Sequence, residues 1–299
     1  MDRLSAMQIF VRVAELGSFS AAAAQLDLDR SVVTRQIAAL EAHLGIKLME
    51  RSTRRLSLSA AGATYLEKCR LILNLVEVAE SDLAEEGTQL RGRLRLSLPL
   101  SFGLKRLAPL LLRFASLHPD LALDMDYSDR HANLIEEGLD LSIRVSPGLA
   151  DTEVARKIGR AQLWVVASPD YLARHGRPRT PAELAHHQCL AYTANGQAAW
   201  PPFRVNDTLE QVPLRSRISA NNGDVLIEAA ARGLGITFQP DFICEDYVAQ
   251  GRVEVLLRDF PLPELGVFAL LPSNRHVPLK VRAMIDFLKQ GLAVGESDY

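Results

Sequence analysis

Residues 17–35 read GSFSAAAAQLDLDRSVVTR and hold the strongest local pattern of the chain. An Ala-rich segment, residues 21–26, is followed by a tight connection at residues 27–30 and by a second segment of helical periodicity. The first turn of that second segment carries hydroxyl and guanidinium side chains. Two short helices joined in this way form a helix-turn-helix, whose second helix presents polar side chains to the DNA major groove.

The flanking residues complete a small head around these two helices. A first helix is expected over about residues 5–16, ended by Gly17, and Ser18 and Asp29 suit the N-caps of the next two helices. The second of these helices has apolar residues at 4-3-4 spacing: Val33, Ile37, Leu40 and Leu44. Two strand-like runs, residues 47–51 and 55–58, then predict a wing.

The charge distribution supports a nucleic-acid contact at this head. The net charge of −2 says little by itself. Residues 30–55, however, hold six Lys or Arg against two acids, whereas the segment from Glu67 to Glu86 is acidic. Positive charge is therefore concentrated where a phosphate-binding face is required.

A long helix is predicted after the wing, over residues 63–86, with Ser59 as its cap and Gly62 tolerated in its first turn. This segment contains no proline and no internal glycine. Its apolar seam is Leu66, Cys69, Leu73, Val76 and Leu83. A seam of this length favours a partner helix in a dimer. The alternative is that the helix packs on its own chain.

After a hinge-like segment at residues 87–92, strands and helices alternate. Strands are expected at residues 93–98, 121–127, 139–145, 162–167, 235–238 and 267–271. Helices are expected at residues 104–117, 131–137, 225–232 and 279–292, and one begins at Pro169. This order predicts an α/β fold of two lobes with mainly parallel sheets, between which the chain crosses twice.

The composition bounds the class of protein. With 299 residues the chain suits two or three domains. It has no apolar run of about 18 residues that would predict a membrane span. The first residues lead into an amphipathic helix rather than a signal peptide, so we expect a cytoplasmic protein. Its three cysteines are far apart and form neither a disulfide framework nor a metal motif.

No pattern supports catalysis, a cofactor or a metal. The GxSxG, Walker and HExxH motifs do not occur, and the seven histidines lack ligand spacing. Gly233-Leu234-Gly235 precedes a strand, the wrong order for a dinucleotide motif. Cys189 and Cys244 could sense oxidants, but their apolar neighbours favour buried, inert thiols.

The chain resembles the LysR-type transcriptional regulators over essentially its whole length. The specific matches are residues 14–23, 33–37, 40–41, 44–45, 48, 50–51 and 58–62, with looser matches at 233–236 and 238–240. Residues 53–55 and 140–144 are similar to the CrgA-like subgroup of that family. One departure is Asp29-Arg30, where the family usually has a serine-rich start to the recognition helix.

The resemblance implies three parts: a winged helix-turn-helix at residues 1–59 (helix-turn-helix at about 19–38), a linker and dimerisation helix at 60–88, and a two-lobed, periplasmic-binding-protein-like effector domain at 93–292. It further implies a homodimer or homotetramer that binds double-stranded promoter or operator DNA, responds to a small-molecule effector and contacts RNA polymerase, with no membrane partner.

Two sets of site residues follow from these patterns. The expected DNA-binding residues are Ser18, Arg30, Ser31, Thr34, Arg35, Gln36, Arg51, Thr53, Arg54 and Arg55. The expected effector-binding residues, which lie mostly at strand ends, are Leu100, Ser101, Phe102, Arg144, Val145, Ser146, Asn221, Asn222, Asp224 and Phe238.

Helix starts near Ser101 and Asn222, together with the cation of Arg144, predict an organic anion as the effector. The alternative for Arg144 is a structural salt bridge. Three other functions stay open at this point: a redox-responsive regulator, a solute-binding receptor, and an enzyme with an accessory DNA-binding head.

Overall fold

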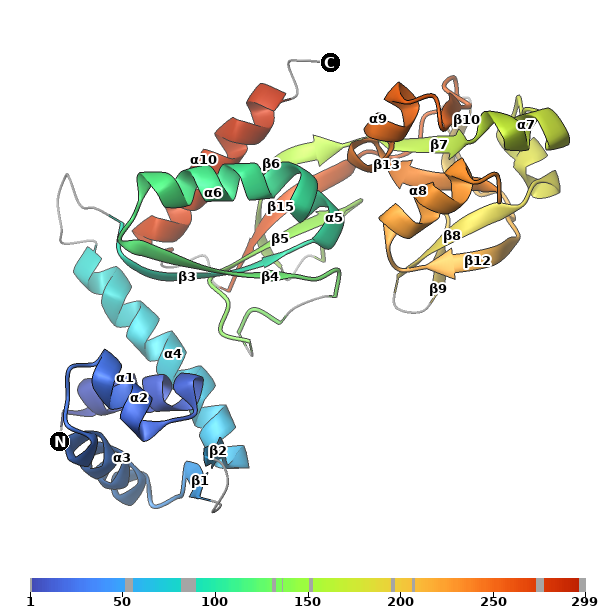
Figure 1. Ribbon diagram of the computed structural model, residues 1–299. Coiled ribbons are helices and arrows are strands. Elements are labelled where there is room, and N and C mark those ends of the chain that lie inside the picture. The colour runs from blue at the N-terminus through green and yellow to red at the C-terminus, as the bar shows by residue number, and fades with distance from the viewer. Residues whose placement is uncertain are drawn as a thin grey trace. The chain divides into compact units, whose positions relative to one another are not determined.

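The computed structural model describes residues 2–51, 56–81, 90–130, 133–135, 137–150, 153–194, 197–205, 208–272 and 277–295. The chain divides into two compact units (Figure 1). The first consists of residues 1–90 with 133–140 and 272–282. The second consists of residues 91–132, 141–271 and 283–299.

Three helices build the head in the first unit: α1 (Arg3–Leu16), α2 (Phe19–Gln25) and α3 (Arg30–Leu44). Gly17 and Gly45 adopt the left-handed conformation that ends α1 and α3, since a residue without Cβ adopts it without strain. The Ser18 side chain caps α2, as predicted. Asp29 occupies the N-cap position of α3, but its side chain makes no capping hydrogen bond.

The predicted apolar faces form the core of the head. Its buried members include Ile9, Phe10, Val13, Ala22, Ala23, Val33, Ile37 and Leu40. Leu44, the last member of the predicted stripe, is 37% exposed, because α3 ends there and extends beyond the core. The three helices are therefore held by one small apolar cluster.

The wing consists of β1 (Met49–Arg51) and β2 (Leu56–Leu58), which pair antiparallel. Helix α4 (Ala60–Ser81) follows, and the Ser59 hydroxyl accepts a hydrogen bond from the Gly62 N–H at its start (2.9 Å). The helix thus begins directly after Ser59, its predicted cap. Its predicted end, including Leu83, lies outside the described residues.

The seam of α4 is divided between two environments. Leu66 and Cys69 belong to the buried core of the head, so this half of the helix packs on its own chain. One turn further on, Leu73 and Val76 of the predicted seam are half-buried, and Ile72 and Leu75, which precede them in the chain, are 37% and 54% exposed. Only the second half of the described helix therefore leaves apolar surface open for a partner.

Gly62 proves to be required rather than tolerated. A Cβ at this position would lie 2.0 Å from the carbonyl oxygen of Leu48, a backbone atom that cannot swing aside. We expect Gly62→Ala to lower the free energy of unfolding of the head by about 1–3 kcal/mol, because the wing must move away from α4. Gly148→Ala, where the new methyl group meets nothing within 4 Å, is the matched control. Thermal unfolding of the two variants checks this, and equal midpoints would contradict the close packing of α4 on the wing.

The second unit has two lobes, each built on one sheet (Figure 1). The five-stranded sheet of lobe I has the order β4-β3-β5-β15-β6. Its strands are β3 (Gly92–Leu98), β4 (Leu121–Tyr127), β5 (Leu141–Ser146), β6 (Val154–Ala161) and β15 (Leu265–Leu271). Helices α6 (Ala108–Leu117) and α10 (Leu279–Gly295) pack on each other through Phe114 and Phe287, whose ring centroids are 5.2 Å apart.

Lobe II contains a six-stranded sheet of order β12-β8-β13-β7-β14, with β9 beside β8. Its strands are β7 (Leu163–Ala167), β8 (Cys189–Ala194), β9 (Gln197–Ala199), β12 (Ser216–Ala220), β13 (Ile236–Pro240) and β14 (Glu254–Leu256). The helices are α7 (Pro169–His175), a 3-10 turn (Pro181–His186), α8 (Gly223–Ala231) and α9 (Asp241–Ala249). A hairpin of β10 (Phe203–Val205) and β11 (Thr208–Glu210) completes the lobe.

The predicted double crossing is present, but the expectation of mainly parallel sheets is wrong. The chain leaves lobe I after β6, builds lobe II and returns as β15 between β5 and β6. In lobe I, β3 pairs parallel with β4 and β5, whereas β15 pairs antiparallel with β5 and β6. In lobe II, β8 pairs parallel with β12 and β13 but antiparallel with β9, and β7 pairs antiparallel with β13 and β14. In lobe I the antiparallel pairs are those of β15, the strand with which the chain returns from lobe II.

Two helix predictions also need correction. The helix expected at residues 104–117 begins at α5 (Leu100–Phe102) and passes through a π-helical turn, Gly103–Leu107, ahead of Pro109. Proline cannot donate the hydrogen bond of a regular α-helix, and the wider turn accommodates it. The described residues between 131 and 137 form a turn rather than a helix. The Asn133 side chain accepts from the Ile135 N–H, and Gly138 closes the turn with a positive φ.

Candidate DNA-binding helix and effector cavity

Helix α3 separates an apolar face from a polar one. Val33 and Ile37 are buried in the head, while Arg30, Ser31 and Arg35 are exposed. Because these three residues occupy the first two turns of an exposed helix face, they can reach base edges or phosphates together.

The remaining predicted DNA contacts differ in their surroundings. Thr34 and Gln36 are half-buried, and the Thr34 hydroxyl donates to the carbonyl oxygen of Arg30 (2.9 Å), so its proton is already used within the helix. Ser18 caps α2. Arg51 lies in β1, while Thr53, Arg54 and Arg55 fall outside the described residues.

A buried carboxylate joins α3 to the wing. Glu41 accepts hydrogen bonds from the N–H groups of Leu48 (2.9 Å) and Met49 (3.1 Å) and from Nζ of Lys47 (2.7 Å). Burial alone raises the pKa of this carboxyl group, but the hydrogen bonds outweigh it and hold the pKa below its ordinary value. The sequence analysis included Glu41 only in the charge balance of residues 30–55 and did not predict its burial. Its position next to Leu40, on the apolar side of the helix, could have indicated a buried carboxylate.

We expect the head to lose stability in acid through Glu41. Because its pKa is lower in the folded than in the unfolded chain, its contribution is fully present above the unfolded pKa of about 4.3 and is lost as the pH falls through the folded pKa. Glu41→Gln should remove about 1–3 kcal/mol near neutral pH and reduce the acid dependence. Denaturant unfolding between about pH 3 and pH 7 measures both effects. Glu50→Gln on the exposed side of β1 is the control, and an equal effect of the two changes would contradict the assignment.

One cavity of about 1040 Å³ lies between the two lobes within the second unit. Nine of the ten predicted effector-binding residues line it: Leu100, Ser101, Phe102, Arg144, Val145, Ser146, Asn221, Asn222 and Phe238. They come from the ends of β3, β5, β12 and β13 and from the first turns of α5 and α8. Residues distant in sequence are thus brought to one cavity, as expected of an α/β binding domain.

Asp224, the tenth residue, does not line the cavity. It lies in the first turn of α8, where its carboxylate accepts a hydrogen bond from the Ser101 hydroxyl (2.5 Å) and approaches Nζ of Lys105 (3.6 Å). These contacts join lobe I to lobe II beside the cavity. Phe102 and Phe242 add an edge-to-face ring contact at 5.0 Å, and Arg106 pairs with Glu245.

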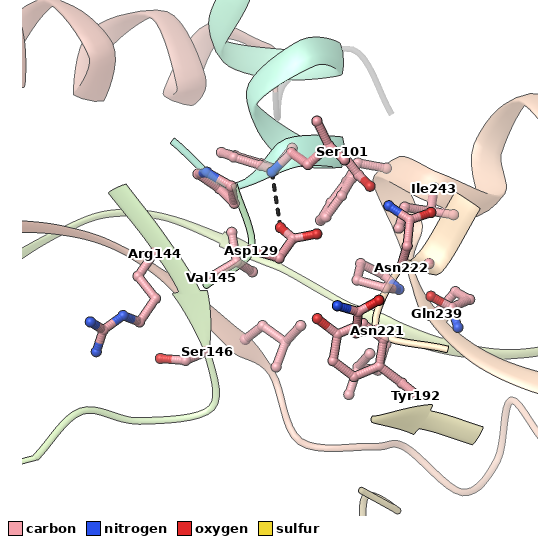
Figure 2. Close-up of a pocket in the computed structure, with 18 of the residues that line it drawn as sticks. Ser101, Asp129, Arg144, Val145, Ser146, Tyr192, Asn221, Asn222, Gln239 and Ile243 are labelled. Atoms are coloured by element: carbon pink, nitrogen blue, oxygen red, sulfur yellow. Dashed lines mark hydrogen bonds between the residues drawn. The ribbon is translucent and has the colours of Figure 1, made fainter. Parts of the chain in front are cut away.

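The charges differ from those expected for an anion site. The Arg144 guanidinium donates to Glu153 (2.5 Å), and Figure 2 shows it pointing away from Asn221 and Asn222. This is the structural salt bridge that the sequence left open. The other cation of the lining, Arg130, lies 3.8 Å from Asp126.

The first turn of α5 is also engaged by the protein itself. The N–H of Leu100 donates to a carboxylate oxygen of Asp129 (2.9 Å), the contact drawn as a dashed line in Figure 2. Burial between the cavity walls raises the pKa of Asp129, as does the neighbouring charge of Asp224. An acid of the chain therefore sits where a bound anion was predicted, and the expectation of an organic anion loses its support.

Sequence reasoning missed several lining residues. Tyr127 is the last residue of β4 and Asp129 follows it, so both lie at the carboxyl end of that strand. The rule that ligands bind at strand ends could have included them. Tyr192 and Trp200 come from the β8–β10 region of lobe II, where no strand was predicted. Burial raises the pKa of Tyr192, and the nearby charge of Asp129 raises it further.

The cysteines give a redox mechanism no support. Cys69, Cys189 and Cys244 are all buried and free. Burial raises the pKa of Cys69 to about 11 and that of Cys189 to about 12, and it raises the pKa of Cys244 as well. Thiols held protonated in this way are poor nucleophiles towards oxidants.

The part of the chain that the structure describes holds neither a cluster of metal ligands nor a helix suited to cross a membrane. No group of three or more His, Cys, Asp or Glu side chains there could hold a metal ion. None of its helices combines the length and apolar character needed to cross a membrane.

A head with an exposed polar helix and a second unit with an interlobe cavity together define a ligand-responsive DNA-binding protein. Comparison with protein families agrees with this class. Residues 4–63 match the bacterial regulatory helix-turn-helix proteins of the lysR family, and residues 87–293 match the LysR substrate binding domain. The chain belongs to the LysR family of transcriptional regulators and is not an enzyme.

Individual relatives cover nearly the whole chain. An HTH-type transcriptional regulator of Haemophilus influenzae is 34% identical, over 94% of this chain and 98% of its own length. The regulator CrgA of Neisseria meningitidis serogroup C is 34% identical over 96% of both chains. The solved structure of CrgA from Neisseria meningitidis matches with a TM-score of 0.60 and 33% identity, over 96% of this chain and 98% of that one. The solved full-length structure of the Vibrio cholerae virulence activator AphB matches with a TM-score of 0.59 and 28% identity, over 96% of this chain and 98% of that one.

Proposed function

We propose that this protein binds specific promoter or operator DNA through the exposed face of α3, and that a small molecule in the interlobe cavity controls the binding. The observation that carries the proposal is the pairing of these two surfaces in one chain. Ser31 and Arg35 supply a hydroxyl and a guanidinium at the start of an exposed helix. The cavity supplies both apolar walls and convergent polar groups.

The three functional parts are the winged head at residues 1–59, the linker helix at 60–88 and the effector domain at 93–292. The exposed Ile72 and Leu75 of α4 support a homodimer, because apolar side chains on a long helix are stabilised by a partner. A homotetramer of two such dimers and a contact with RNA polymerase complete the proposal. The protein acts in the cytoplasm, where it reaches DNA.

The effector changes transcription by favouring one arrangement of the dimer over another. A ligand shifts such an equilibrium only through its different affinity for the two arrangements. The cavity is placed for this role because both lobes contribute to it, and Ser101 and Phe102 touch lobe II directly. The DNA contacts themselves are made by the head, so residues of the cavity are needed for the response to the effector and not for contact with DNA.

Selection of genomic DNA fragments by the purified protein tests the proposal. We expect enrichment of a small set of sites that contain two half-sites about one or more helical turns apart, as a dimer of recognition helices requires. Gel-shift titrations on an enriched site, with and without small molecules that bind the cavity, then test the control. Enrichment of random fragments only, or a site affinity that no cavity ligand changes, would count against it.

A further inference from the structure

The charged groups of the interlobe cavity do not balance. Among the lining residues that the structure describes, the charged side chains are Asp129, Arg130 and Arg144. Arg144 pairs with Glu153 and Arg130 with Asp126. Among the residues that the structure describes, no cation pairs with Asp129, whose hydrogen bond is to the backbone N–H of Leu100. The described part of the lining therefore carries an unpaired negative charge.

The two helix starts at the cavity already have acidic side chains of their own. Asp129 accepts from the first turn of α5, and Asp224 lies in the first turn of α8. The partial positive charge of a helix N-terminus attracts an anion most strongly when no carboxylate is near it. Here the chain itself places a carboxylate at each of the two helix starts, so an added anion would lie close to the carboxylate of Asp129. Such like charges repel strongly in a site walled by protein.

The rest of the lining favours a cation. Aromatic rings surround the cavity: Phe102, Tyr127, Tyr192, Trp200, Phe238 and Phe242. Trp200 and Phe238 meet edge to face with centroids 5.7 Å apart. Asp129 belongs to lobe I and Tyr192 and Asn221 to lobe II, and Figure 2 shows Tyr192 and Asn221 on the side of Asp129 that lies away from Arg144. Ring faces attract ammonium groups, and amide and phenol oxygens accept their hydrogen bonds.

We propose that the effector of this cavity is an organic amine: a protonated nitrogen held by Asp129, attached to an apolar or aromatic body that packs on the ring walls. This inference rests on the proposed function, because it assigns a ligand class to the same cavity. The raised pKa of Asp129 agrees with a carboxylate that lacks a counter-ion. Binding of an ammonium group would supply that counter-ion without disturbing the hydrogen bond to Leu100.

The test uses three probes of similar size and shape on the full-length protein. Phenethylamine is the cation, phenethyl alcohol the neutral analogue and hydrocinnamate the anion. Calorimetry at about neutral pH measures the affinity of each, and the tryptophan fluorescence, to which Trp200 in the cavity wall contributes beside Trp164, provides a second signal. We expect the amine to bind about tenfold or more tightly than the anion, the ratio that one charge-assisted hydrogen bond supports.

Asp129→Asn is the decisive variant. The asparagine oxygen can still accept from the N–H of Leu100, so the turn is kept while the charge is removed. The preference for the amine over the alcohol should disappear in this variant. Asp124→Asn is the matched control, because Asp124 lies in β4, the strand that leads to Asp129, but pairs with Arg93 and Arg95 away from the cavity lining. It should bind all three probes like the parent.

Three results would overturn the inference. The first is tighter binding of hydrocinnamate than of the amine, and the second is an amine preference that persists in Asp129→Asn. The third is that no probe binds at millimolar concentration. Gel shifts on a selected DNA site distinguish a failure of this inference from a failure of the proposed function, because they measure DNA binding independently of the ligand class. A protein that binds its site but prefers the anion contradicts only the amine class. A protein that binds the amine but no specific DNA contradicts only the role as a regulator.

Discussion

Replacing Arg35 by alanine is expected to weaken specific DNA binding by about 5- to 150-fold while the fold and the oligomer are kept. Arg35 is exposed on the polar side of α3, and its side chain carries no part of the head core. A guanidinium that forks onto the O6 and N7 atoms of a guanine contributes about 1–3 kcal/mol of discrimination. Gel-shift titration on a selected site, against an unrelated fragment of equal length, measures the loss.

Arg35→Lys separates base reading from simple attraction to phosphate. Lysine keeps the charge but loses the planar fork, so it should restore non-specific binding more than specific binding. The salt dependence of the two affinities is the second readout, because a lost phosphate contact reduces its slope. If Arg35→Ala binds its site as tightly as the parent, the assignment of α3 as the recognition helix is wrong.

The second large effect is expected at α4. Aspartate at both Ile72 and Leu75 should dissociate the oligomer, because each charge would be buried without a partner in the helix pair at a cost of several kcal/mol. These residues are the appropriate targets because they are exposed in the single chain, so their replacement leaves the core of the head intact. Leu66 and Cys69, further back on the seam, would report on the fold instead.

Sedimentation velocity measures the oligomeric state of this double variant. The control places two aspartates at Ala63 and Thr64, which are exposed on the same helix within its first turns. The control should sediment like the parent, while the double variant should lose mass and also lose affinity for a two-half-site DNA. An unchanged sedimentation coefficient in the double variant would place the dimer contact elsewhere on the chain.

The head was predictable from the sequence because its signals are local. The helix periodicities, the Ser18 cap and the glycines at the ends of α1 and α3 act over three or four residues, and the structure has each of them. The same reasoning failed at residues 131–137, where the helical pattern was outweighed by a side-chain turn at Asn133 and by Gly138. A short segment gains little from helix formation, so a local hydrogen bond between a side chain and the backbone can outweigh its helical pattern.

The positions of the candidate effector residues followed from a general rule, but their partners did not. Strand ends at Ser101, Arg144 and Asn222 were expected to meet, and all three line one cavity. The partners of Ser101 and Arg144, which are Asp224 and Glu153, changed the chemistry expected there. Asp129 changed it further, because it occupies the helix start that an anion was predicted to take.

The sequence by itself determined the family, the order of helices and strands in the head, and the two crossings between lobes, since each of these depends on residues near one another along the chain. Only the tertiary structure decided the mixed direction of the sheets, the division of the α4 seam and the charge of the cavity. The physical reason is that Coulomb attraction and hydrogen bonding depend on distances in space. Glu41 with Met49, Ser101 with Asp224 and Leu100 with Asp129 become neighbours only when the chain has folded.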